Sequence, residues 1–247
     1  MPSAVPVQPI PVTTPTPATG TRPSGASGGR NGTSGPDSLR GSAGADLIFG
    51  LGGPDSILGL AANDSLYGGD GDDSILGDAG NDLLFGGAGG DSVLGGLGDD
   101  TFYGGKGSDS MLGDDGNDLL FGNQDTDTLL GGAGNDTFFG GAGDDSLFGG
   151  IGDDCLSGDR GRDTLTGGVG NDTFAIGRQA DGDVITDFSD GTDRIRLTAG
   201  LTFGELTISA GAGTTTSTII QFTSSKETLA TLFGVARTSI SQADFIF

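Results

Sequence analysis

The sequence contains no histidine, no tryptophan and a single cysteine, Cys155, and only two of its 34 acidic residues are glutamate. Without histidine there can be no Ser–His–Asp triad and no HExxH zinc site. A single cysteine excludes an intramolecular disulfide. Lysine and arginine together number 11, so the net charge is −23. This is the opposite of the basic footprint that nucleic acid or an anionic membrane surface requires, and neither is an expected partner.

Long apolar runs are also missing. None approaches the roughly 18 residues that a membrane-spanning helix needs. The N-terminus has no cationic region followed by an apolar core, so it does not resemble a classical signal peptide. There is no P-loop, and no nucleophile is paired with a base. We therefore expect no membrane span and no enzymatic activity.

Glycine is abundant, with 52 residues, and it recurs in a fixed pattern. The segment GGAGNDTFFGGAGDDSLFGG, residues 131–150, shows one nine-residue unit twice. Sixteen such units follow one another in phase over residues 32–175, with glycine at position one and an apolar residue at position eight of every unit. Position six is always aspartate, at Asp37, Asp46, Asp55, Asp64, Asp73, Asp82, Asp91, Asp100, Asp109, Asp118, Asp127, Asp136, Asp145, Asp154, Asp163 and Asp172.

The array separates the chain into three predicted regions. Residues 1–31 hold seven of the nine prolines among valine, threonine, serine and glycine, which predicts a disordered tail. Residues 32–175 are the repeats. Residues 176–247 lose the nine-residue rhythm and alternate apolar with polar residues, which predicts antiparallel strands. Because a stack of repeats exposes its end, we expect this last region to be a cap.

The repeat predicts an all-β fold. We expect positions seven to nine to form a short strand with position eight inside, and positions one to six to form a turn in which glycines one and four adopt φ > 0. Position nine alternates between an aromatic set and a mainly leucine set, so the structural period is eighteen residues. The simplest object with this period is a right-handed parallel β-roll of about eight coils, with two parallel sheets and with the position-nine residues as apolar stripes outside. These stripes are Phe49, Tyr67, Phe85, Tyr103, Phe121 and Phe139 on one face, and Leu58, Leu76, Leu94, Leu112, Leu130 and Phe148 on the other.

In such a roll the aspartates form one column along each edge. Two carboxylates one strand spacing apart repel by about 0.9 kcal/mol even at the dielectric constant of water. The array carries 26 aspartates and four basic residues, so cations are needed between the turns. Carboxylate and carbonyl oxygens in flexible turns suit Ca²⁺ better than Mg²⁺. Eight turns on each edge leave seven gaps, which gives up to about 14 Ca²⁺. In the alternative interpretation each aspartate only bonds its own turn.

The unit G-G-x-G-x-D-x-(apolar)-x, as in GGAGNDTFF, GGAGDDSLF and GGVGNDTFA, resembles the RTX, or hemolysin-type, calcium-binding nonapeptide repeat. The resemblance implies that each calcium lies between turns two repeats apart, held by the sixteen aspartates and by turn carbonyls. Pro36, Pro54, Ala62 and Asp125 depart from the pattern, and the first three predict weaker or missing sites at the start of the array. Further acidic residues are expected to be solvated turn residues, namely Asp70, Asp78, Asp114, Asp115 and Asp159.

The last region resembles the cap that follows the repeats in RTX proteins, where Asp187, Asp190 and Asp193 are candidates for one further ion. The ending SISQADFIF looks like the C-terminal signal of proteins exported by type I machinery. We therefore expect a secreted protein that folds in extracellular calcium and has a structural or surface-associated role. Two alternatives remain open: a non-catalytic regulatory or secretion module for a separate chain, and an adhesion or recognition protein.

Overall fold

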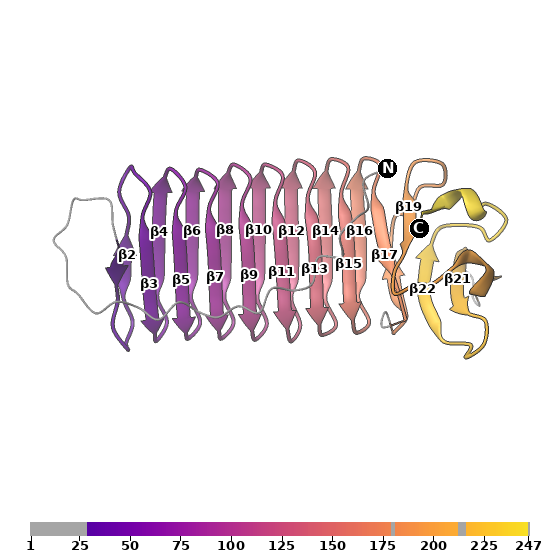
Figure 1. The fold of residues 1–247 in the computed structure, drawn as a ribbon, viewed down its shortest axis with the longest axis horizontal. Coiled ribbons are helices and arrows are strands. Elements are labelled where there is room, and N and C mark those ends of the chain that lie inside the picture. Colours follow the sequence, from indigo (N-terminus) through magenta and orange to yellow (C-terminus); the bar gives the residue numbers. More distant parts are fainter. Residues whose placement is uncertain (1–28, 179–180, 212–215, 247) are drawn as a thin grey trace.

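A computed structural model describes residues 29–178, 181–211 and 216–246. Short strands lie side by side in an elongated stack, and two sheets face each other across a thin core (Figure 1). The strands are β1 (Arg30–Asn31), β2 (Ser38–Arg40), β3 (Leu47–Gly52), β4 (Ser56–Ala61), β5 (Ser65–Asp70), β6 (Ser74–Ala79), β7 (Leu83–Ala88), β8 (Ser92–Leu97), β9 (Thr101–Lys106), β10 (Ser110–Asp115), β11 (Leu119–Gln124), β12 (Thr128–Ala133), β13 (Thr137–Ala142), β14 (Ser146–Ile151), β15 (Cys155–Arg160), β16 (Thr164–Val169), β17 (Thr173–Ile176), β18 (Asp183–Ile185), β19 (Arg194–Leu197), β20 (Leu206–Ala210), β21 (Ser217–Phe222), β22 (Thr228–Phe233) and β23 (Phe245–Ile246).

The strands alternate between the two sheets, which confirms the predicted parallel β-roll. Odd-numbered strands from β1 to β19 pair in order in one sheet, hereafter sheet A, and β23 is added beside β19. Even-numbered strands from β2 to β18 pair in order in the other, sheet B, followed by β22, β21 and β20. From β1 to β15 each strand pairs with the strand of its sheet eighteen residues later, as in Leu119↔Thr137. One coil of the roll is therefore one eighteen-residue period of the sequence.

The predicted strand length was wrong. A typical strand has six residues and covers positions seven, eight, nine, one, two and three, so only positions four to six form the turn. Pairing continues through the glycines, as in Gly132↔Gly150, because parallel neighbours supply backbone partners whatever the side chain. Glycine has a low preference for strands, and this led the sequence analysis to assign these residues to the turn.

The reason predicted for glycine was correct at position four and wrong at position one. Position four does have positive φ, for example 135° at Gly134. Position two also has positive φ, even where it is Leu60 or Asp159. Position one has an ordinary backbone and faces the interior. A Cβ added at Gly131 would overlap with the carboxylate of Asp136 and with the Gly149 carbonyl, so close approach explains this glycine.

The core is a single file of position-eight side chains. From Ile48 to Phe174 these residues are at most 1% exposed. Position nine points to the outer faces, as predicted. On sheet A the six aromatic rings from Phe49 to Phe139 stack, with centroids 4.5–5.0 Å apart, so each ring is partly covered by its neighbours.

The described part of the predicted tail contains a short strand, which corrects that prediction. Arg30 and Asn31 form β1 and pair with Ile48 and Phe49 of β3. The rest of the predicted tail, residues 1–28, lies outside the described residues. Within the ranges that the structure describes, no helix is long and apolar enough to cross a membrane.

The C-terminal region first adds strands to the roll and then forms the cap at its end. Strands β17, β18 and β19 add to the stack in parallel, and β22 then pairs in parallel with β18. Strands β20 and β21 follow in antiparallel pairing, which confirms the small antiparallel element at this end. Two short 3₁₀ turns, Phe203–Glu205 and Gln242–Asp244, connect these strands (yellow end of Figure 1).

Candidate metal centre

The sixteen predicted aspartates lie in the turns as two columns, one along each edge of the roll. Asp37 is half-buried and the other fifteen are at most 4% exposed. The structure adds one member to each column. The first column is Asp37, Asp55, Asp73, Asp91, Asp109, Asp127, Asp145, Asp163 and Asp183, and the second is Asp46, Asp64, Asp82, Asp100, Asp118, Asp136, Asp154, Asp172 and Asp193.

One oxygen of each carboxylate connects successive coils. The backbone N–H of every column aspartate but the last donates to Oδ1 of the next aspartate in its column, at 2.7–3.1 Å. The bond from Asp100 N–H to Asp118 Oδ1, for example, is 2.8 Å long. These bonds hold all the carboxylates in one orientation, so the second oxygen, Oδ2, also occupies an equivalent place in each coil.

That second oxygen is buried without a partner. Fourteen Oδ2 atoms of the columns have no hydrogen bond, from Asp55 to Asp163 and again at Asp183. The thirteen from Asp55 to Asp163 each lie beside the position-one glycine of their own unit, and most of these also have a glycine carbonyl of the next coil close by. At Gly59, a Cβ would overlap with Asp64 Oδ2 and lie 2.8 Å from the Gly77 carbonyl oxygen. The absence of a side chain therefore leaves a cradle whose walls are carboxylate and carbonyl oxygens.

The cradle disfavours negative charge when no cation is present. Burial raises the pKa of Asp127 to about 8 and those of Asp100 and Asp118 to about 7. The backbone hydrogen bond to each carboxylate opposes this shift, and neighbouring column carboxylates add to it. Buried charges are stable only when they are paired or coordinate a metal. The column residues therefore need either protons or cations.

The first coil differs from the rest. Oδ2 of Asp37 accepts a hydrogen bond from the Thr33 N–H, and Oδ2 of Asp46 accepts one from the Ser42 N–H, each at 2.6 Å. The hydroxyls of Thr33 and Ser42 donate to the same oxygens at 2.9 Å. In these two turns the aspartate bonds its own turn, the alternative considered from the sequence. A partner for Oδ2 reduces the need for a cation there.

Asp183 is not among the aspartates predicted from the sequence, and Asp193 was predicted only as a candidate ligand for a further ion. Both occupy position six, but they follow the previous member by 20 and 21 residues instead of 18. The rhythm Asp–x–Ile, in Asp183–Ile185 and Asp193–Ile195, is the signal that could have found them. Asp187 lies outside the columns and accepts from the Gly167 and Gly168 N–H groups, while Asp190 is exposed.

Five further aspartates were expected to be turn residues, and the structure corrects this. They lie instead at the ends of strands, on β5, β6, β10 and β15, and all five are exposed. The longer strands explain the difference, since positions two and three belong to the strand. These residues are Asp70, Asp78, Asp114, Asp115 and Asp159.

The donor set fits calcium. Across the described ranges, no three aspartate, glutamate or cysteine side chains are grouped to hold a metal by themselves. A cation in a cradle would instead share carboxylate oxygens with backbone carbonyls. All these donors are hard oxygens in glycine turns, and such sites suit the large and variable coordination shell of Ca²⁺.

The family model for the RTX calcium-binding nonapeptide repeat matches the chain at residues 31–57, 49–84, 58–93, 85–120, 121–155 and 151–182. Together these matches span residues 31–182, more than half of the chain, so the chain belongs to this family of calcium-binding repeat proteins.

A comparison with curated proteins found no match. Among solved structures, the chain is similar to the extracellular lipase LipA from Serratia marcescens, with 20% identity and a TM-score of 0.31 over 87% of this chain and 40% of the lipase. It is also similar to the AlgE6R3 subunit of the Azotobacter vinelandii mannuronan C5-epimerase, with 26% identity and a TM-score of 0.23 over 68% of this chain and 80% of that subunit. The chain thus spans well under half the length of the lipase. At these TM-scores neither likeness supports a conclusion about function.

Proposed function

We propose that this chain is a secreted protein whose roll folds when it binds several calcium ions outside the cell. The observation that carries the proposal is the set of fourteen buried carboxylate oxygens without hydrogen-bond partners, arranged in two columns. The ligands would be the position-six aspartates, extended by Asp183 and Asp193, together with turn carbonyls. Calcium supplies the positive charge that the columns otherwise lack, at up to about 14 ions.

The occupancy should not be uniform along the columns. Oδ2 of Asp37 and Oδ2 of Asp46 each accept hydrogen bonds from their own turn, so the first turn on each edge should bind calcium most weakly. From Asp55 to Asp163 Oδ2 has no partner, whereas Oδ2 of Asp193, at the end of the second column, accepts a hydrogen bond from the Ser189 N–H at 2.7 Å. The weak sites predicted from Pro54 and Ala62 should therefore be nearly as strong as those in the middle of the array.

Calcium-dependent folding would help secretion, because the chain would fold only after export. Extracellular calcium modules bind at roughly 10⁻⁴ to 10⁻³ M, above cytosolic calcium and within the extracellular range. The chain would therefore stay unfolded and able to pass through an exporter until it reaches the exterior. The ending that resembles a type I signal supports this order, because Asp244 and Phe245 are buried against the cap in the folded protein. An exporter would have to bind this segment before the cap forms.

Outside the cell we propose a structural or surface-associated role without catalysis. A regulatory module for a separate chain and a recognition protein remain alternatives. The stacked rings of sheet A largely cover one another, which favours packing over recognition at that face. Capture of one specific protein by the calcium-loaded chain from the medium of the producing cells would favour the regulatory module.

Far-ultraviolet circular dichroism during a calcium titration tests the proposal, with magnesium as the control. A cooperative gain of β signal between about 0.1 and 1 mM calcium, absent with magnesium, is expected. A chain that is already folded in chelator at pH 8 would contradict it. Export is tested separately, by deleting the last nine residues and measuring the protein in the medium.

A further inference from the structure

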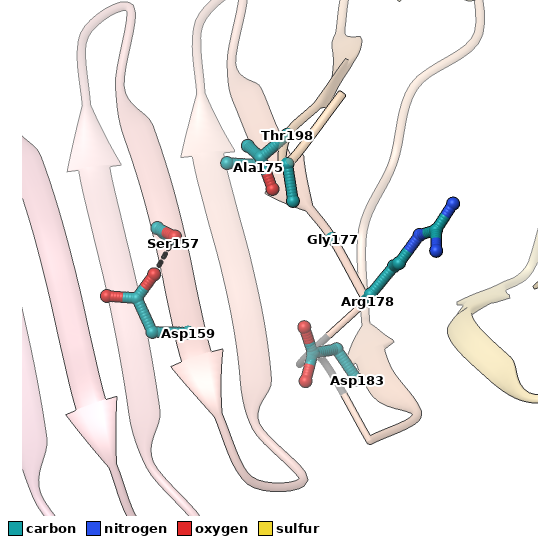
Figure 2. A pocket seen from close by; sticks show the side chains of 8 residues that line it. Ser157, Asp159, Ala175, Gly177, Arg178, Asp183 and Thr198 are labelled. Carbon is teal, nitrogen blue, oxygen red and sulfur yellow. Dashed lines mark hydrogen bonds between the residues drawn. The ribbon is translucent and has the colours of Figure 1, made fainter. Parts of the chain in front are cut away.

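A cavity of about 180 Å³ lies where the last repeat strands of sheet A meet the C-terminal cap. Its walls include Ser157 and Asp159 from β15, Ala175 from β17, and Thr198 and Asp183 from the cap side (Figure 2). The volume is enough for several water molecules, at about 30 Å³ each. A hydrated metal ion is of the same size.

The cavity exists because the row of rings on sheet A ends. Position nine is aromatic up to Phe139 and then becomes Ser157 and Ala175 in the next two coils. These small side chains do not cover the space that a ring would fill. What remains is a hollow lined by the polar groups of neighbouring strands.

Asp183 supplies a buried and unpaired oxygen at this cavity. Its side chain is fully buried, no N–H or hydroxyl group donates to its Oδ2, and the carboxyl of Asp163 lies within hydrogen-bonding reach of its own carboxyl. In the other coils the matching oxygen lies beside a position-one glycine. Here position one is Ile176 in place of glycine, and its side chain is buried. The carboxylate of Asp183 instead lines the cavity, as Figure 2 shows.

Asp159 brings a second carboxylate to the same cavity. It lies at position two of β15, on the outer face of sheet A, and its Oδ1 accepts a hydrogen bond from the Ser157 hydroxyl at 2.8 Å. Asp159 keeps part of its surface exposed, yet enough water is displaced from its carboxyl to raise its pKa. Asp159 is thus the exposed carboxylate of the cavity, and Asp183 is the buried one.

The arginines nearby do not neutralise this pair. The Arg178 guanidinium also lines the cavity, but it is 3.4 Å from Glu205 and lies over the Phe222 ring, 4.4 Å from the ring centroid. In Figure 2 it extends away from Asp183. Arg160 acts electrostatically on Asp159, though less strongly than desolvation does. Burial raises the pKa of Asp183 to about 9, the neighbouring carboxylates of Asp163 and Asp159 add to this, and no basic side chain opposes it.

We propose that this cavity binds one hard divalent cation, Ca²⁺ in the extracellular medium, between the carboxylates of Asp159 and Asp183. The hydroxyl oxygens of Ser157 and Thr198 and several waters would complete its shell. This site differs from the turn sites, because Asp159 and Ser157 lie on the face of a sheet. It would join the last repeat strands to the cap, and it would share Asp183 with the end of the first turn column.

Anomalous diffraction from crystals grown in millimolar CaCl₂ tests the site directly. The wild-type protein should show an anomalous peak between Asp159 and Asp183 in addition to the peaks in the turns. Asp159→Asn should lose that peak and keep the others. Asp114→Asn is the matched control, because Asp114 is also an exposed position-two aspartate with positive φ. This control should keep every peak.

A second variant tests the cavity without altering a carboxylate. Ala175→Phe continues the row of rings into the hollow, and it should also remove the peak. Turn peaks without a peak between Asp159 and Asp183 in the wild type would overturn the proposal. That result would leave the turn sites standing, whereas the absence of turn peaks would count against the proposed function.

Discussion

The backbone N–H of Asp118 donates to Oδ1 of Asp136, eighteen residues later and 2.8 Å away. This contact repeats along both edges of the roll and uses only one of the two carboxylate oxygens. The other oxygen of each carboxylate is buried and unpaired through most of the array. One bond therefore fixes the geometry of the turns, while the oxygen that it leaves free creates the need for a cation.

Substitution of a column aspartate should reduce calcium binding where its Oδ2 has no hydrogen-bond partner, and should have little effect where Oδ2 has one. Asp118→Asn should lower the number of bound ions by one or two and raise the calcium concentration needed for folding. Asp46→Asn should leave the count nearly unchanged, because Ser42 already donates to that oxygen. Equilibrium dialysis with Ca²⁺ measures both. Equal losses from the two variants would contradict the assignment.

The position-one glycines should be more sensitive than other glycines. Gly131→Ala places a Cβ onto the Asp136 carboxylate and 2.7 Å from the Gly149 carbonyl oxygen, so it should weaken calcium binding and destabilise the folded protein by more than about 2 kcal/mol. The control is Gly35→Ala, where nothing lies within 4 Å of the new Cβ. Urea unfolding in calcium should separate the two, with a change of no more than about 1 kcal/mol in the control.

Without calcium, the stability of the roll should fall as pH rises. Burial raises the folded-state pKa of Asp100 and Asp118 to about 7 and that of Asp127 to about 8, above the roughly 3.9 of an unfolded aspartate. Between these values the folded chain holds protons that the unfolded chain has released. The free energy of unfolding therefore decreases from about pH 4 to about pH 8.

Circular dichroism in chelator should accordingly show more β structure at pH 5 than at pH 8, and added calcium should restore it at pH 8. Magnesium chloride at the same ionic strength is the control for charge screening. A β signal in chelator that grows between pH 5 and pH 8 would count against the buried, unpaired carboxylates.

The row of rings should contribute to stability through its neighbours. Tyr103 stacks between Phe85 and Phe121, with centroids 4.8 and 5.0 Å away. Tyr103→Ala removes two stacked pairs, each worth about 0.5–1.5 kcal/mol beyond buried area. Leu112→Ala, at position nine of sheet B, removes an apolar side chain without stacking and should cost less. A double-mutant cycle of Tyr103 and Phe121 in calcium should give a coupling energy above about 0.5 kcal/mol, and a value near zero would contradict this stacking contribution.

The nine-residue repeat was sufficient to predict the architecture, because the core and the length of the coil depend on few positions of the repeat. A single apolar residue per unit, as at Phe138, determines the core, and the alternation at position nine determines the eighteen-residue coil. The strand length could not be predicted from the sequence, because glycine has a low strand propensity and yet pairs through its backbone in this parallel sheet. Asp183 was missed because a two-residue insertion breaks the spacing while the turn geometry is kept. The cavity beside it depends on the packing of the cap, which periodicity does not describe.

The alternation of the two faces also restricts how such a molecule can change in length. Deleting nine residues from the middle of the array would move every later unit to the opposite sheet and place Leu112 in the row of rings beside Phe85. Deleting eighteen restores the match of every side chain with its neighbours. Insertions and deletions that keep this match therefore add or remove two repeat units at a time. Each such step changes the length of the roll by about 4.8 Å. The smallest change in length that keeps both faces of the roll intact is therefore one pair of repeats.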